Sequence, residues 1–229
     1  VQGVSWNLHG LSIGNFEELV ERMDDQLEWK IFLVQELASP NGCGWVQDGM
    51  WKGHRLYTND GSKKWDTAVL VHKKWAHMAR WKGETENAVA VWIADERQYH
   101  EKKGGILAVS VHLPTAAESA DKYRQALQEV TDMCRSCPAT NTREITGVDA
   151  NVEVHGDKED NEAGGAVVGS RAPQGGNGGT AREDEFLGWV SGKKQRVANA
   201  FYTTRKQAEE KDQGRRGAST RGSPDASTP

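Results

Sequence analysis

Short runs of aliphatic and β-branched residues recur along the middle of this chain, and glycine- and lysine-rich breaks separate them. The runs cover residues 54–58, 67–72, 88–94 and 106–113. Runs of this length that are bounded by turn residues are typical of β-strands, because core helices need longer apolar stretches. The sequence therefore predicts successive strands in a sheet-rich middle.

The N-terminal part predicts a strand, a helix and a second strand. Residues 1–7 form the first strand, and a helix over residues 15–29 follows, with Asn15 and Glu18 at the spacing of a capping box. One apolar stripe runs along this helix and comprises Phe16, Leu19, Val20, Met23 and Leu27. The continuous apolar run over residues 31–34 indicates a strand that is covered on both faces.

A second helix is predicted over residues 116–134, after the sheet-rich middle. Thr115 and Glu118 have capping-box spacing, and the residues that repeat on one face are Ala120, Tyr123, Leu127 and Val130. A strand over residues 144–149, a helix over 181–190 and a strand over 196–202 complete the predicted α/β domain.

Two segments lack the composition of a folded core. Residues 156–180 hold eight glycines and no aromatic residue, which is typical of a long surface loop. Residues 205–229 contain no large apolar residue, so they predict a disordered tail. We therefore expect one domain over residues 1–204 and a disordered tail over residues 205–229.

Charge and composition exclude several classes of protein. A formal net charge of −4 excludes a uniformly basic nucleic-acid coat but allows a local basic groove. No run approaches the roughly 18–20 apolar residues that span a bilayer, and no basic-then-apolar leader opens the chain. We therefore expect an intracellular protein, nuclear or cytoplasmic, with no membrane partner. Val1 already lies in an apolar run, so we expect the chain to be a fragment.

The cysteine content points to a reducing compartment. Three cysteines cannot form a complete set of disulfides, and Cys134 and Cys137 make a single CxxC pair without a second pair. We expect this pair to be inert packing rather than a redox site.

Polar residues stand at the carboxyl ends of the predicted strands. Asn7 ends the first strand, Glu36 follows the second, His112 ends a later one, and Asp149 and Asn151 close another. Strand ends are where sites assemble in layered α/β folds. Together these five residues form a set that can hold a hard cation and a phosphate.

The chemistry of each residue suggests its role. Mg²⁺ prefers oxygen ligands and keeps several waters, so Glu36 with Asn7 can form a metal site, with Mn²⁺ as a substitute. Asp149 and Asn151 point the same way if their segment is extended. Asp149 can then orient or deprotonate an attacking water while Asn151 donates to a phosphate oxygen. A protonated His112 can neutralise charge on the phosphoryl oxygens.

Each of these residues also has a purely structural interpretation. Asn7 can be a turn residue, Asp149 with Asn151 can form an Asx-turn, and His112 can be a hydrogen-bonded core histidine. Glu36 is the least ordinary of the set, because a carboxylate at the end of a buried strand is costly unless it is paired. Their order along the chain is what favours a common site.

Taken in order, the segments WNLHG, VQEL, DTAVLVHKKW, LAVSVHLP and DANV resemble the endonuclease/exonuclease/phosphatase superfamily, which includes DNase I. TAREDEFLGW over 180–189, followed by QRVANAFY over 195–202, is most similar to the endonuclease domains of LINE-type retrotransposons. The resemblance implies an α+β fold with four α/β/β/α layers, in which helices cover two mainly antiparallel sheets. It also implies Mg²⁺-dependent hydrolysis of a phosphodiester.

The resemblance implies a role for each candidate residue. Asn7 and Glu36 match the metal-site Asn and Glu of the family. Asp149 and Asn151 match the D-x-N pair that aligns the attacking water and contacts the scissile phosphate. His112 matches a histidine near that phosphate.

The chain departs from the family pattern in two places. Val148 separates Gly147 from Asp149, where the family has G-D-x-N. Family members also end on a strand with an Asp-His pair, whereas no histidine follows His155 here. We therefore expect the C-terminal strands of the fold to be absent.

Three functional hypotheses follow. The favoured one is a retrotransposon-type endonuclease that cuts nucleic acid, DNA foremost. The second is a superfamily member that acts on a lipid or small phosphodiester, and the third is a truncated, inactive remnant that at most binds nucleic acid.

Lysines and tryptophans are mixed in two short segments, and two explanations are open, a DNA-binding edge or scattered surface lysines. The residues are Lys63, Lys64, Trp65, Lys73, Lys74 and Trp75. The sequence carries no signal for an oligomeric state.

Overall fold

A computed structural model describes residues 3–8, 13–26, 28–38, 48–59, 65–95, 102–115, 117–152 and 181–193. The chain divides into two compact units, Val1–Val152 and Glu153–Pro229. The first unit contains all the described strands. In the second, the described element is helix α3 (Ala181–Gly192), which confirms the helix predicted over 181–190.

The described strands of the first unit form two sheets. Sheet A has the order β1-β2-β5-β4-β3, and sheet B has the order β6-β7-β8-β9. Sheet A comprises β1 (Gly3–Asn7), β2 (Ile31–Ala38), β3 (Gly49–Trp51), β4 (His54–Thr58) and β5 (Trp65–Val71). Sheet B comprises β6 (Ala79–Thr85), β7 (Ala88–Ile93), β8 (Ile106–His112) and β9 (Arg143–Asp149). β1 runs parallel to β2 and β8 parallel to β9, whereas the other paired strands are antiparallel.

The two sheets pack face to face through an apolar layer. Ile31 and Leu33 of β2 lie in one cluster with Val89 and Val91 of β7. Phe32 and Val34, which alternate with them along β2, lie in a second cluster on the opposite face of sheet A. The prediction that residues 31–34 are covered on both faces is therefore confirmed.

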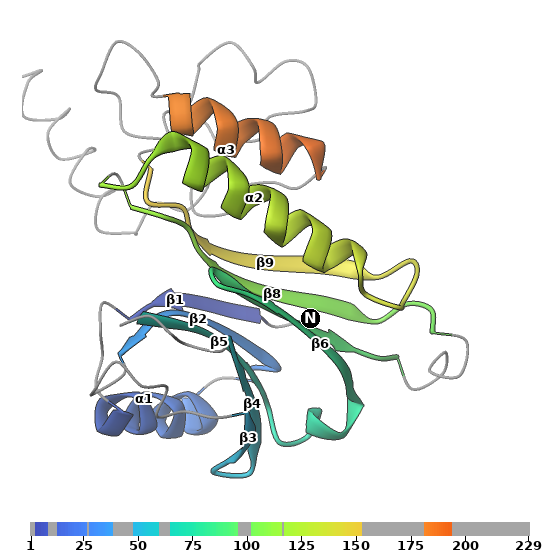
Figure 1. Cartoon of the computed structure of the whole chain (residues 1–229). Helices are drawn as coiled ribbons and strands as arrows, with labels where there is room; N and C mark the ends of the chain where they lie inside the picture. The colour runs from blue at the N-terminus through green and yellow to red at the C-terminus, as the bar shows by residue number, and fades with distance from the viewer. Residues whose placement is uncertain are drawn as a thin grey trace, which may run out of the picture. The chain divides into compact units, whose positions relative to one another are not determined.

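Helices cover the two outer faces of the sandwich, as Figure 1 shows. Phe16, Val20 and Met23 of α1 (Ile13–Gln26) pack against the outer face of sheet A. α2 (Ala120–Arg135) buries Tyr123, Val130 and other apolar residues of one face, and it lies against β6 and β7 of sheet B. The first unit thus has four layers in the order α/β/β/α, which confirms the predicted fold class.

The boundaries of both helices differ from the prediction. α1 begins at Ile13, so Asn15 lies inside the helix and is not its cap. α2 begins at Ala120, and Ser119 rather than Thr115 is its N-cap, because the Ser119 hydroxyl accepts a hydrogen bond from the Lys122 N–H. Both predicted capping boxes are therefore wrong.

Two strands were not predicted from the sequence. β3 and β6 are each at an edge of their sheet. The predictions for residues 156–180, 196–202 and 205–229, and for the terminal strands, lie outside the described residues. Among the helices that the structure describes, none has the length and apolar character needed to cross a membrane.

Candidate active site

The carboxyl ends of four strands meet at one rim of the sandwich. In sheet A, Asn7 of β1 is in register with Gln35 of β2, directly before Glu36. In sheet B, His112 of β8 is in register with Asp149 of β9. Because both strand pairs are parallel, each sheet presents two polar residues at the same end.

Contacts across the rim join the two sheets. The Asn7 amide nitrogen donates one hydrogen bond to Glu36 Oε1, at 3.1 Å, and a second, short one to Asp149 Oδ2. His112 Nε2 lies 3.6 Å from Glu36 Oε1 and 3.8 Å from Asp149 Oδ2. One ligand atom from each of Glu36, His112 and Asp149 lies within 4.8 Å of the other two. The structure therefore brings together four of the five predicted site residues.

A β-bulge directs Glu36 toward this rim. Between Val34 and Leu37, β2 carries one residue more than β5, and Glu36 has the left-handed φ of 54°. Gln35 faces the apolar layer between the sheets, whereas Leu37 packs on the helix side. Side chains of a regular strand alternate between its two faces, so Glu36, the residue after Gln35, would point to the helix side. The extra residue instead frees the Glu36 carboxylate to lie beside Asp149.

Asn151 has a different arrangement from the one predicted. Its φ is 49°, so the segment is not extended, and its N–H donates to Asp149 Oδ1 at 3.2 Å, as in an Asx-turn. Its side-chain amide donates to the Leu113 carbonyl at 2.7 Å. The condition for Asp149 and Asn151 to point the same way, an extended segment, is therefore not met, and the alternative Asx-turn is the one observed. The Tyr123 hydroxyl anchors this turn by donating to the Ala150 carbonyl at 2.9 Å.

The chemistry of the rim fits a divalent cation. Two carboxylates approach each other, and their side chains are only 21% exposed for Glu36 and 19% for Asp149. Such a pair is unfavourable without a proton or a cation between its members. His112 Nε2 is buried and has no hydrogen-bond partner among the described residues. A hard ion held by the carboxylates would relieve the repulsion.

Of the described residues, a second group also has metal-ligand spacing, namely Asp24, His54 and His72. His54 Nδ1 accepts the Lys73 N–H at 3.1 Å, and His72 Nδ1 accepts the Lys74 N–H at 3.2 Å. Each neutral imidazole therefore carries its proton on Nε2. Both Nε2 atoms lie 3.3 Å from an Asp24 oxygen. A metal would need the lone pairs that these protons occupy, so this group is a hydrogen-bond network.

Two further donors complete the Asp24 network. Lys73 Nζ lies 2.8 Å from Asp24 Oδ2, and Trp29 Nε1 lies 3.0 Å from Asp24 Oδ1. Burial lowers the pKa of both histidines, and the charge of Asp24 offsets this only in part. Burial acts to raise the pKa of Asp24, but the Lys73 hydrogen bond and the nearby positive charges outweigh it, so that pKa is lowered.

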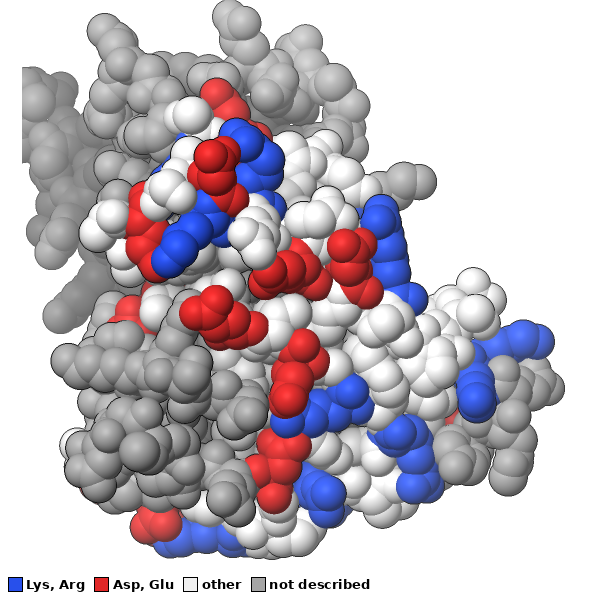
Figure 2. Space-filling model, in the orientation of Figure 1, with Lys and Arg blue, Asp and Glu red and all other residues white. Residues whose placement is uncertain are grey.

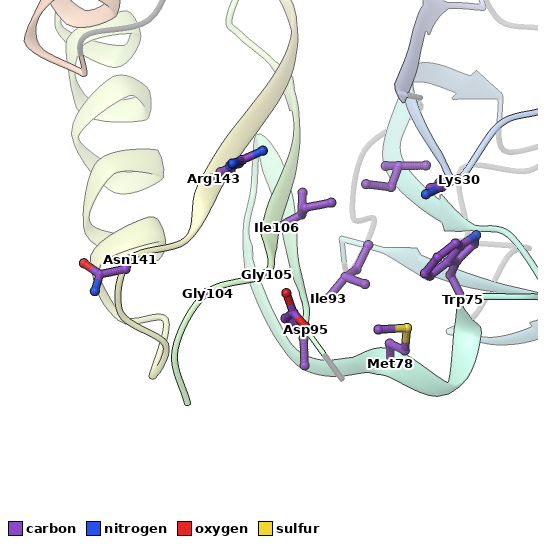
Figure 3. A pocket seen from close by; sticks show the side chains of 12 residues that line it. Lys30, Trp75, Met78, Ile93, Asp95, Gly104, Gly105, Ile106, Asn141 and Arg143 are labelled. Atoms are coloured by element: carbon purple, nitrogen blue, oxygen red, sulfur yellow. The ribbon is translucent and has the colours of Figure 1, made fainter. Parts of the chain in front are cut away.

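A pocket of about 520 Å³ lies at the opposite rim of the sandwich. Its lining includes Lys30 before β2, Gly105 before β8 and Arg143 at the start of β9, so it opens where these strands begin. Figure 3 shows Trp75 beside Lys30, whose ammonium nitrogen is 4.1 Å from the ring centroid. This pocket is separate from the four side chains at the carboxyl rim.

The weaker sequence signals have structural explanations where the residues are described. Lys73 is paired with Asp24. Lys63, Lys64 and the Trp65 side chain lie outside the described residues. Cys134 and Cys137 form no disulfide within the described part of the chain, and burial raises the pKa of Cys137, which disfavours the reactive thiolate.

The residues directly beneath the candidate site and those of the Asp24 network were not predicted from the sequence. Gln35 and Ser110, both buried, bond to each other across the two sheets. A polar residue inside an apolar strand was the available signal for both. For the network, no spacing rule connects Asp24 with histidines 30 and more residues away.

No protein-family model matches the chain, and no curated protein matches it. Similar solved structures include TDP2 from Caenorhabditis elegans, at 15% identity and TM-score 0.42, covering 66% of this chain and 47% of that one. An AP endonuclease from Archaeoglobus fulgidus has 11% identity and TM-score 0.43, covering 67% of this chain and 58% of that one. The chain thus spans about half the length of these structures. These low scores leave the site geometry as the basis for a functional assignment.

Proposed function

We propose that this chain is a metal-dependent phosphodiesterase of the endonuclease/exonuclease/phosphatase superfamily, and specifically a retrotransposon-type endonuclease. One observation carries the proposal. Two carboxylates, an amide and an imidazole from four strands of two sheets converge within contact distance at one rim. The order of the sequence motifs agrees with this family.

Glu36 and Asn7 are the metal-site residues in this proposal, and Asp149, which lies within ion-sharing reach of Glu36, would contribute a carboxylate oxygen to the same ion. Glu36 would supply a carboxylate oxygen to Mg²⁺ or Mn²⁺, and the Asn7 amide, bonded to both carboxylates, holds them in place. The ion, when bound, supplies positive charge that stabilises the phosphorane-like transition state and lowers the pKa of a bound water.

The remaining residues act on the water and the phosphate. Asp149 orients the attacking water and takes its proton. His112 donates from Nε2 to a phosphoryl oxygen, which gives this buried atom a partner. Asn151 donates one side-chain amide N–H to the Leu113 carbonyl, and the second N–H of the same amide can donate to a phosphate oxygen.

We propose nucleic acid, and DNA foremost, as the substrate. The family resemblance supports this assignment. On the face drawn in Figure 2, basic and acidic side chains alternate over α2. The basic side chains of α2 form ion pairs with acidic side chains one turn earlier, at 3.0 Å for Arg124–Asp121 and 3.2 Å for Lys122–Glu118. α2 is therefore unsuited to bind a phosphate backbone, and we assign substrate contact to the rim.

A nicking assay on supercoiled plasmid with Mg²⁺ tests the proposal. Glu36→Gln keeps the shape of the side chain and removes its charge, so nicking should fall by about 10²-fold or more. Glu21→Gln is the matched control, because Glu21 of α1 makes an exposed ion pair with Lys52, away from the rim. Unchanged nicking in Glu36→Gln would refute the assignment.

A substrate panel separates the three functional hypotheses. Selective turnover of DNA over RNA and sphingomyelin supports an endonuclease, and turnover of sphingomyelin supports the lipid hypothesis. No turnover of any substrate, with DNA binding that weakens steeply as salt rises, supports the inactive remnant.

A further inference from the structure

A second layer of side chains lies directly beneath the four site residues. Ser110 precedes His112 by two positions in β8, and Gly147 precedes Asp149 by two positions in β9. Residues two apart in a strand face the same side. Gln35 directly precedes the bulged Glu36, and it faces the same interior. Three of the strands that carry the site therefore also carry this layer.

Hydrogen bonds in this layer connect sheet A to sheet B. Gln35 Nε2 donates to Ser110 Oγ at 2.9 Å and to the Gly147 carbonyl at 3.3 Å. Ser110 Oγ in turn donates to the Val34 carbonyl at 2.6 Å. Gln35 is 2% exposed and Ser110 is fully buried. We call Gln35, Ser110 and Gly147 the inter-sheet bridge.

The absence of a side chain at Gly147 allows this close approach. A Cβ there would lie 3.0 Å from Gln35 Nε2, 2.9 Å from Leu33 Cβ and 2.3 Å from Ser5 Oγ. Leu33 Cβ sits next to the backbone and cannot rotate away. The two sheets are therefore closer at this point than any other residue would permit.

The inter-sheet bridge fixes the offset between the sheets where the site needs it. The surrounding interface is aliphatic, and apolar contacts are not directional, so they resist sliding of one sheet over the other only weakly. Hydrogen bonds have defined lengths and directions. Asn7 and Glu36 belong to sheet A, whereas His112 and Asp149 belong to sheet B. The spacing of the two carboxylates thus depends directly on this offset.

We infer that Gln35 and Ser110 are positioning residues, which hold the two halves of the site at the spacing that lets Glu36 and Asp149 share one ion. The metal-binding part of this inference rests on the proposed function. The alignment of the two halves does not, since it is a property of the metal-free chain.

The test compares Gln35→Leu and Ser110→Ala, singly and combined, with wild type. The combined variant replaces both partners of the Gln35–Ser110 bond by apolar groups, so it should cost less stability than the sum of the two single changes, each of which leaves a buried side chain with fewer bonds. Val71→Ala is the control. Val71 is fully buried in the same apolar layer, but it pairs with Ile31 at the start of β2, far from the rim that carries the site residues.

The first readout needs no metal. The Asn7 side-chain amide bonds to carboxylates of both sheets, and its NMR signals can be assigned through their loss in Asn7→Asp. We expect slow exchange of its protons with water in wild type and in Val71→Ala, and fast exchange in the combined variant. Protection that persists in the combined variant would overturn the inference.

The second readout is the affinity for Mn²⁺. We expect the combined variant to bind Mn²⁺ about 10- to 100-fold more weakly than wild type and than Val71→Ala. Val71→Ala should lose stability and keep its affinity. If the combined variant binds Mn²⁺ as tightly as Val71→Ala, the bridge is only structural and the inference fails. If wild type binds no Mn²⁺, the proposed function fails, while the amide exchange still decides the alignment.

Discussion

Replacing Glu36 by glycine and by alanine should give stabilities in the reverse of their usual order. The φ of 54° at Glu36 costs a residue with a Cβ about 1–2 kcal/mol, a cost that glycine does not bear. Glycine in turn lowers the free energy of unfolding by about 0.4–1 kcal/mol relative to alanine, because its unfolded chain has more conformational freedom. The difference leaves Glu36→Gly more stable than Glu36→Ala by about 0.5–1 kcal/mol.

The comparison isolates the backbone because both variants lack the carboxylate. Each loses the hydrogen bond from Asn7 and the repulsion with Asp149, so these contributions cancel. Glu84 provides a matched pair, since it lies in β6 at an ordinary φ. There, Glu84→Gly should be less stable than Glu84→Ala by about 0.5–1 kcal/mol.

Urea denaturation in EDTA, followed by the fluorescence of the nine tryptophans, measures these differences. The midpoint should be higher for Glu36→Gly than for Glu36→Ala and lower for Glu84→Gly than for Glu84→Ala. If glycine is the less stable variant at both positions, Glu36 does not occupy a left-handed bulge. The account of how its carboxylate reaches the rim would then be refuted.

Three further predictions concern stability. Burial lowers the pKa of His54 and of His72, so below about pH 6.5 the unfolded chain binds more protons than the folded chain. The free energy of unfolding should therefore fall as the pH drops, by up to about 1.4 kcal/mol per pH unit for each proton. A free energy of unfolding that stays constant from pH 7 to 5 would contradict this. Gly147→Ala should cost about 1–3 kcal/mol by overpacking, measured as a lower urea midpoint, and a neutral effect would show that the sheets can separate freely. Tyr123→Phe should cost about 1 kcal/mol through the lost bond to the Ala150 carbonyl, and an unchanged midpoint would discount that bond.

The strands whose side chains are buried on both faces could be predicted from the sequence. In β2 and β7 the apolar run itself defines the strand, because both faces need apolar cover. β6 is different, since its sequence ARWKGET is largely polar and lies at an edge of sheet B. Edge strands carry charged residues that oppose further pairing, so their composition resembles that of a loop.

The residues that meet at the rim could be predicted by type and position, but their geometry could not. Asn7, His112 and Asp149 end strands and Glu36 lies two residues before the end of β2, and parallel pairing brings such ends together. The orientation of Glu36 depends on one extra residue in β2, which no pattern of hydrophobicity indicates. Asn151 also turns left-handed after the strand, where a simple alternation of side chains no longer applies.

The packing of the two sheets could not be predicted from the sequence either, because it depends on contacts between residues far apart in the chain. Ser110 and Gly147 are small residues in buried strands, and alone they indicate nothing. Their meaning arises only when Gln35, from the other sheet, lies against both. Such a contact joins residues 75 and 112 positions apart in the chain.

Crystals of this chain soaked in Mn²⁺ test most directly whether the rim holds a divalent ion. The account predicts one anomalous peak at about 2.0–2.2 Å from carboxylate oxygens of both Glu36 and Asp149, and its loss in Glu36→Gln. A peak at Asp24, His54 and His72 instead, or a rim peak that persists in Glu36→Gln, would contradict it.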